Sequence, residues 1–249
     1  MNSPPFYLDW TFWSTAIALL ALLLSQLPPI HQLVKGAKLE VEPFDRITVT
    51  HTVGNPNANL YVSIINAGGS TVAIRSMHLT VKRSDSAEFE MPARLYWPNQ
   101  TDKQAVILPS FKLEPHEHWS HLVNFFRPFG RNEEKEYRQL VASIRDDINL
   151  KRAQLVNANN TAEAAAGRVN PLINFFTNRF KWEPGEYEVT LTVVANPNRA
   201  SVSTKYRITL FESDAVELKN YSNDYKFGLG VYFFDSMKHP GVHILLSRA

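Results

Sequence analysis

The sequence predicts a mainly β domain with an α-helical insertion, preceded by one N-terminal transmembrane helix. Three patterns support this fold class: an uncharged apolar segment near the N-terminus, alternating apolar residues along most of the remaining chain, and a stretch of helical spacing in its second half. These changes of pattern divide the chain into an anchor with its linker, residues 1–36, and one domain, residues 37–249, with the insertion at about 128–181.

The first element is the apolar segment Trp10–Leu27, which contains no charged residue. As a helix, its 18 residues would be about 27 Å long, close to the hydrocarbon thickness of about 30 Å. Phe6 and Tyr7 can extend the segment, and aromatic residues at one end suit the membrane interface. Pro28 and Pro29 would end the helix, because neither donates a backbone hydrogen bond.

Two alternatives to a membrane anchor remain open. A cleavable signal peptide would begin with basic residues, but residues 1–9 contain none, and no small-residue cleavage motif follows the apolar segment. A buried core helix is the other alternative. The segment is apolar on all sides, which favours lipid over the interior of a domain.

The flanking charges predict the orientation in the cell membrane. Lys35 and Lys38 follow the segment, whereas no basic residue precedes it. The positive-inside rule then places the folded domain in the cytoplasm and a short N-terminus outside, with a single span between them. An exported domain is the alternative.

Small residues repeat along one side of the predicted membrane helix, at spacings of three and four positions. They are Ser14, Ala18, Ala21 and Ser25. Small side chains let a second helix approach closely, and hydroxyl groups can bond across such a contact. The stripe therefore predicts self-association or docking onto a partner's membrane helix, with chance occurrence as the alternative.

Alternation predicts the strands that precede the insertion: Lys38–Glu42, Arg46–Thr52, Leu60–Asn66, Val72–Lys82, Ala105–Leu108 and Trp119–Phe125. Gly68 and Gly69 can supply the positive φ of a tight turn between the third and fourth of these strands. The alternation changes phase at Arg75–Ser76, which predicts a β-bulge. Leu113–Glu117 is expected to form a turn.

The insertion shows helical spacing over Asn132–Val156, with Asn132 as a cap and acidic residues in the first turn. A polar stretch follows, and Pro171–Phe180 is expected to form a second helix with Pro171 at its first position. Four further strands are expected at Tyr187–Val194, Ser203–Phe211, Phe227–Phe234 and Val242–Leu246. The last two would form a closing hairpin.

Three stretches resemble an immunoglobulin- or fibronectin-type β-sandwich: NLYVSIINAGGSTVAIRSMHLTV, LEPHEHWS and WEPGEYEVTLTV. In those folds a Pro-Gly turn leads into a strand that begins with Tyr, and Tyr187 matches the position of the tyrosine corner. The resemblance covers about 150 residues and implies an immunoglobulin-like β-sandwich, but no particular function. The chain has no cysteine, so the inter-sheet disulfide of that family is absent.

Composition excludes several chemistries. Without cysteine there are no thiolate nucleophiles or cysteine metal ligands. The 26 Lys and Arg residues nearly balance the 24 Asp and Glu residues, which does not indicate a nucleic-acid partner. No P-loop, dinucleotide-binding or nucleophile-elbow motif is present, so we predict no catalytic residue and no cofactor.

Histidines near residue 118 are the only candidate metal ligands. In a strand, His116 and His118 would share a face with Glu114 and could bind zinc or copper, whereas His121 would point the other way. A solvated polar turn is the alternative, and we favour it over a metal site.

An aromatic stretch at the end of the insertion is a candidate docking face. Its residues are Phe175, Phe176, Arg179, Phe180 and Trp182. Aromatic residues and Arg are favoured at the centres of protein interfaces, but a helix that packs into the core has the same composition.

The predicted function is a non-catalytic binding or assembly module for a protein partner, such as a subunit of a membrane complex. Its partners would be the lipid bilayer and either another protein or a second copy bound through the transmembrane helix. One alternative is a membrane-tethered metal-site protein or hydrolase that uses His116 and His118. Another is a sensor or effector that acts by clustering its transmembrane helix.

Overall fold

The protein is described by a computed structural model that covers residues 10–26, 35–84, 86–99, 101–102, 104–154 and 162–249. The fold is mainly β, as the sequence predicts. The strands are β1 (Leu39–Thr52), β2 (Asn55–Asn66), β3 (Val72–Arg83), β4 (Phe89–Trp97), β5 (Val106–Ile107), β6 (Phe111–Leu113), β7 (His118–Phe126), β8 (Gly185–Asn196), β9 (Val202–Leu210), β10 (Val242–Leu245) and β11 (Ser247–Arg248).

All of these strands belong to one nearly closed antiparallel sheet with the order β10-β1-β2-β7-β4-β3-β8-β9-β11. The short strand β5 pairs with β4, and β6 pairs with β3. The segment that carries β10 and β11 crosses between the two ends of this order, because β10 pairs with β1 and β11 pairs with β9. One segment therefore joins strands that would otherwise be the free edges of the sheet.

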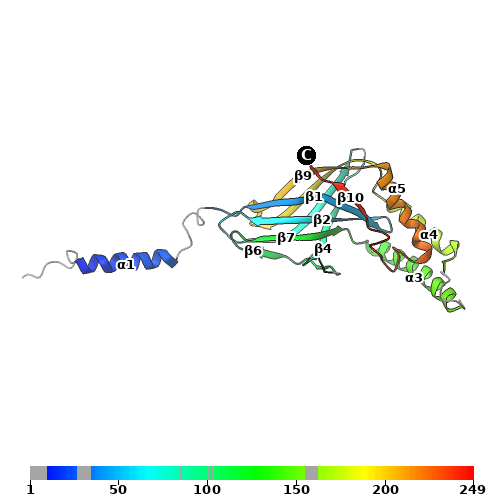
Figure 1. The fold of residues 1–249 in the computed structure, drawn as a ribbon, viewed down its shortest axis with the longest axis horizontal. Coiled ribbons are helices and arrows are strands. Elements are labelled where there is room, and N and C mark those ends of the chain that lie inside the picture. Colours follow the sequence, from blue (N-terminus) through cyan, green and yellow to red (C-terminus); the bar gives the residue numbers. More distant parts are fainter. Residues whose placement is uncertain (1–9, 27–34, 85, 100, 103, 155–161) are drawn as a thin grey trace, which may run out of the picture.

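The helices are α1 (Trp10–Gln26), α3 (Arg131–Gln154), α4 (Ala166–Arg179) and α5 (Glu212–Asn220), with short 3-10 helices at Asn198–Ala200 and Tyr221–Phe227. Figure 1 shows α3, α4 and α5 gathered at one end of the sheet, and α1 apart from it. No helix in the described ranges combines the length and the apolar character needed to cross a bilayer. The predicted transmembrane helix is therefore not confirmed, and Phe6, Tyr7, Leu27, Pro28 and Pro29 lie outside the described residues.

The core lies inside the curved sheet, where alternate residues of each long strand are buried. In β2, Leu60, Val62 and Ile64 are each at most 1% exposed, in agreement with the predicted alternation. At one end of the sheet α4 packs over the turn between β1 and β2. A Cβ atom at Gly54 would lie 2.4 Å from the Phe176 carbonyl oxygen, and its φ is +85°, so this close approach requires glycine.

Several local predictions are confirmed. The register of β3 against β8 shifts between Ile74 and Ser76, where the alternation predicted a bulge. The predicted turn at Leu113–Glu117 is closed by a hydrogen bond from Glu117 N to Glu114 O. Tyr187 donates its hydroxyl hydrogen bond to Glu183 O at 2.5 Å, the backward bond of a tyrosine corner. The immunoglobulin-like sandwich itself stays a prediction.

Other predictions are wrong. The two strands expected at the start of the domain are one strand, β1, with an irregularity between Pro43 and Ile47. Helix α4 begins at Ala166, so Pro171 lies inside it. The expected strand Phe227–Phe234 is a series of turns, because Gly228 and Gly230 have φ of 83° and 72°. The closing hairpin is consequently absent, and β10 pairs with β1 instead.

Candidate functional site

The four aromatic docking candidates are buried, as the core-packing alternative predicts, and their role in docking stays a prediction. Phe175, Phe176, Phe180 and Trp182 are 2%, 6%, 9% and 0% exposed. The Arg179 guanidinium stacks on Phe175, with Cζ 3.6 Å from the ring centre, and its Nη2 lies 3.3 Å from Glu133 Oε1. Phe175 packs against Tyr137 of α3, and Phe176 packs against His51 of β1, so these rings link α3, α4 and the sheet.

The structure does not bring the histidine candidates together as a metal site. His116 lies in the turn before β7, with a φ of 66°, and His118 Nε2 is 2.8 Å from Ser120 Oγ. Glu114 accepts a hydrogen bond from Thr71 Oγ1 at 2.6 Å, while His121 faces the sheet interior beside Trp119. The described part of the chain holds no group of three or more His, Asp or Glu side chains placed to bind a metal ion.

The stripe of small residues lies on α1. Ser14 Oγ donates to Thr11 O at 2.9 Å, and Ser25 Oγ donates to Leu22 O at 2.7 Å, so both hydroxyls bond within their own helix. Ala18 and Ala21 lie between them and are exposed. The interaction of this stripe with another helix stays a prediction.

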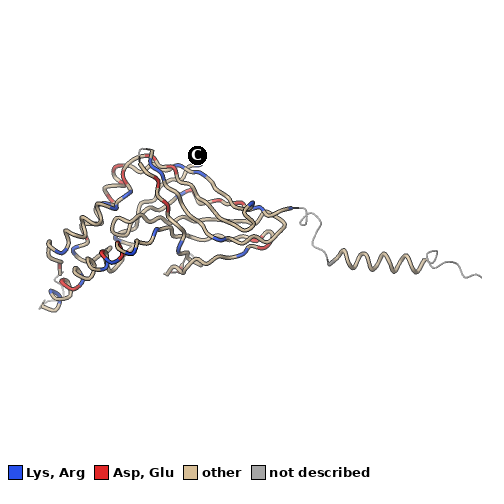
Figure 2. Tube along the Cα trace, turned by 180° about the vertical axis from the view of Figure 1, so that it is seen from behind, with Lys and Arg blue, Asp and Glu red and all other residues tan. Residues whose placement is uncertain are grey.

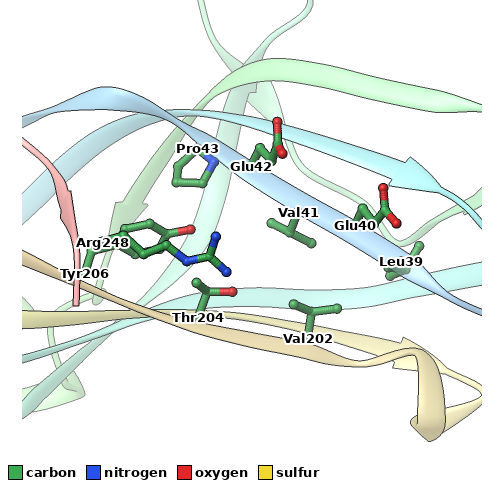
Figure 3. Close-up of a pocket in the computed structure, with 9 residues that line it drawn as sticks. All are labelled: Leu39, Glu40, Val41, Glu42, Pro43, Val202, Thr204, Tyr206 and Arg248. Atoms are coloured by element: carbon green, nitrogen blue, oxygen red, sulfur yellow. The ribbon is translucent and has the colours of Figure 1, made fainter.

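A pocket that sequence reasoning missed lies where the sheet fails to close, between β1 and β9. Its volume is about 440 Å³. Figure 3 shows Val41, Val202 and Thr204 between the two strands with Arg248 reaching toward them, whereas Glu40 and Glu42 point away. The lining residues are Leu39, Glu40, Val41, Glu42, Pro43, Val202, Thr204, Tyr206 and Arg248.

Both walls of this pocket are strand edges. Residues 39–43 of β1 pair with β2, and within the described chain they have no strand partner on the other side. Residues 202–204 of β9 pair with β8 in the same one-sided way. Unpaired edges of this kind offer backbone N–H and C=O groups to another strand.

The two edges run in the same direction. Strand β10 is antiparallel to β1, and β11 is antiparallel to β9. Since β10 and β11 belong to one extended segment, β1 and β9 must be roughly parallel to each other. A single strand that runs antiparallel to both can therefore pair with both, as residues 242–248 do immediately beside the pocket.

The pocket is lined by hydroxyl, carboxylate and guanidinium groups as well as by apolar side chains. Burial raises the pKa of Tyr206, although a hydrogen bond with Thr204 and the charge of Arg248 oppose this shift, so its phenol is neutral at pH 7. Glu40 is exposed and accepts a hydrogen bond from Lys38 Nζ at 2.8 Å. The lining holds the hydroxyl groups of Thr204 and Tyr206, and it contains no histidine.

Comparisons with known proteins add little. No family model and no curated protein sequence matches the chain. Its structure is similar to that of a Bordetella pertussis protein assigned as ApaA, with 11% identity and a TM-score of 0.30, over 71% of this chain and 97% of that one. A protein from Archaeoglobus fulgidus is 7% identical over 70% of this chain and 97% of its own, with a TM-score of 0.28. These scores are too low to support an argument about fold or function.

Proposed function

We propose that this chain is a membrane-anchored, non-catalytic binding module that takes up an extended segment of a protein partner between β1 and β9. The observation that carries the proposal is the pair of parallel, unpaired strand edges that face one another across the pocket. An added strand is a known mode of peptide recognition, in which backbone hydrogen bonds supply affinity and side-chain pockets supply specificity.

The walls of the pocket define the segment that would fit. Leu39, Val41 and Val202 face inward, so alternate side chains of the segment should be apolar. The intervening side chains would lie beside Glu42 and Ser203 on the outer surface and should be polar. Each backbone hydrogen bond formed to either edge would contribute about 0.5–1.5 kcal/mol.

Helix α1 supports the membrane part of the proposal. Figure 2 shows no charged residue along it. Its apolar side chains are exposed, with Leu19, Leu22 and Ile17 each at least 60% exposed. Transfer of apolar surface from water into lipid is favourable by about 25 cal/mol for each Å² that is removed from water. The 17 residues span about 26 Å, compared with about 30 Å of bilayer hydrocarbon.

The membrane anchor is tested by alkaline extraction of cell membranes. We expect the full chain to stay in the membrane pellet, and a Leu20→Arg/Leu23→Arg variant to move to the supernatant. Each Arg at the centre of a membrane helix costs about 2.5–3.5 kcal/mol of insertion. Leu150→Arg is the matched control, because Leu150 is 61% exposed on α3 and lies outside the anchor.

A full chain recovered in the supernatant after alkaline extraction would contradict the membrane anchor.

Protease added to sealed membranes then tests the orientation. We expect the folded domain to be protected when the cytoplasmic side is enclosed, since Lys35 and Lys38 adjoin the anchor on the domain side.

The strand-binding function is tested with a photoreactive amino acid at position 202, inside the pocket, and at position 207, whose backbone already pairs with β11. We expect position 202 to crosslink to one segment of a partner, and position 207 to give no such product. A synthetic peptide of that segment should then bind the purified full chain, and methylation of its alternate backbone nitrogens should weaken binding at least tenfold.

The methylated peptide is the decisive control, because it removes backbone donors and keeps every side chain. Equal binding of the methylated and unmethylated peptides would show that side chains alone hold the partner. Equal crosslinking at positions 202 and 207 would show that the partner does not enter the pocket. Either result would overturn the proposed mode of binding.

A further inference from the structure

We propose that a second pocket, between β3 and β4, binds an amphiphilic anion, meaning a carboxylate or phosphate attached to an apolar chain. The pocket has a volume of about 330 Å³, within the range of about 300–1,000 Å³ for small-molecule sites. Its lining residues are Ile74, Arg75, Ser76, Met77, Pro92, Ala93, Arg94, Leu108, Pro109 and Phe111. This site is separate from the gap between β1 and β9.

The pocket lies at a fork in the sheet. Residues 72–74 of β3 pair with β6, whereas residues 78–81 pair with β4. Between these ladders, residues 75–77 have no strand partner on this side in the described chain, although Ser76 and Met77 pair with β8 on the other. The fork opens because β4 leaves β3 after Pro92, a residue without a backbone N–H, and continues beside β5 and β7.

Two arginines occupy bulge positions at this fork. The register of β3 shifts between Ile74 and Ser76, so Arg75 is the extra residue. The register of β4 shifts between Ala93 and Leu95, so Arg94 is the extra residue there. A bulge changes the direction of a side chain relative to the regular alternation, and here both arginines line the same pocket.

Neither arginine is neutralised by the protein. No ion pair or side-chain hydrogen bond joins Arg75 or Arg94 to any described residue, and no carboxylate lines the pocket. Arg138 and Arg179, by contrast, each lie beside a carboxylate of α3. Guanidinium groups bind carboxylates and phosphates through paired hydrogen bonds, so two free ones at one opening favour an anion.

The floor of the pocket is apolar. Ile74 and Met77 are 2% and 1% exposed, and Phe111, which also lines the pocket, stacks on Trp119 with ring centres 4.9 Å apart. A small inorganic anion would contact the arginines and leave this floor uncovered. An apolar chain attached to the anion would cover it, and this combination specifies the proposed ligand class.

The test uses a photoreactive decanoate that carries a diazirine, together with the corresponding alcohol, on the full chain in neutral-lipid nanodiscs. We expect the decanoate to label peptides containing residues 74–77 and 92–111, and the labelling to saturate as the probe concentration rises. The double substitution Arg75→Gln/Arg94→Gln should weaken the apparent affinity for the decanoate probe at least tenfold. Arg199→Gln/Arg207→Gln, which removes the same charge from exposed positions outside the pocket, should leave it unchanged.

Competition identifies the source of the anion. Short-chain phosphatidic acid and unlabelled decanoate should displace the probe at concentrations at least tenfold below that of inorganic phosphate. The better of the two competitors distinguishes a lipid headgroup from a free fatty acid. Displacement by inorganic phosphate at an equal concentration would overturn the amphiphilic assignment, and so would equal labelling by the alcohol. Unchanged labelling of the Arg75→Gln/Arg94→Gln variant, with an unchanged melting temperature, would overturn the role of the arginines.

Discussion

Replacing Trp182 by Ala should lower the free energy of unfolding by about 4 kcal/mol, the scale observed when large aromatic side chains are removed from cores. Trp182 is fully buried and contacts Phe89 and Tyr187 at ring-centre distances of 5.6 Å and 5.9 Å. Its Nε1 donates to Thr50 O at 2.7 Å. The substitution therefore leaves both a cavity and an unpaired carbonyl, and denaturant titration at pH 7 measures the sum of the two losses.

Phe234→Ala is the matched control for this prediction. Phe234 is 67% exposed, so its removal should change the free energy of unfolding by no more than about 0.5 kcal/mol. Trp182→Phe should fall between the two, because it keeps most of the apolar volume and loses the hydrogen bond. A Trp182→Ala variant as stable as Phe234→Ala would mean that the contacts of Trp182 with β1, β4 and β8 contribute little to stability.

The free energy of unfolding should also fall by about 3 kcal/mol as the pH is lowered from about 6.5 to about 4, because of His51. Burial lowers the pKa of His51 to about 4, and the charge of His239 adds to this, while the bond to Leu218 O opposes it. The neutral ring satisfies both nitrogens: Nε2 donates to Leu218 O at 2.8 Å, and Nδ1 accepts from Gly54 N at 3.2 Å.

The sign of this effect follows from proton binding. An unfolded chain takes up a proton on His51 near pH 6.5, whereas the folded chain does so only near pH 4. Between these values the unfolded state binds more protons, so stability is complete above pH 6.5 and is lost as the pH falls. Chemical unfolding at a series of pH values measures this slope.

Two variants separate His51 from the other titrating groups. His51→Gln should be less stable at pH 7 but should lose less stability on acidification. His118→Gln, at an exposed position on β7, should keep the slope of the parent chain. The prediction would be contradicted if the difference in unfolding free energy between the parent chain and His51→Gln stayed constant from pH 7 to pH 4.5.

Local patterns predicted the regular elements of the fold. The alternation of β2 and β8 and the helical spacing of α3 depend on neighbouring residues that share one environment. Strand β4 was not predicted because Pro92 and two charged residues, Glu90 and Arg94, interrupt its alternation. Phe227–Phe234 was misassigned because its aromatic residues suggested a strand, whereas its glycines adopt left-handed conformations.

The candidate sites could not be predicted because they depend on contacts between distant segments. Nothing in residues 171–182 distinguishes a helix that faces the core from one that faces a partner. The gap between β1 and β9 arises because residues 242–248 cover only part of each edge. Sequence did indicate the bulge at Arg75, but that of Arg94, and the pocket that both residues line, became visible only with the sheet register.

The pairing of β10 with β1 has a consequence during synthesis. Thr48 and His243, which are bonded in the finished protein, are 195 positions apart. A ribosome that adds about 5–20 residues each second needs roughly 10 to 40 seconds to make that interval. Throughout this time β1 has emerged without the strand that will cover it, so a nascent chain should depend on chaperones, or on the bilayer that receives its first helix, to avoid premature association.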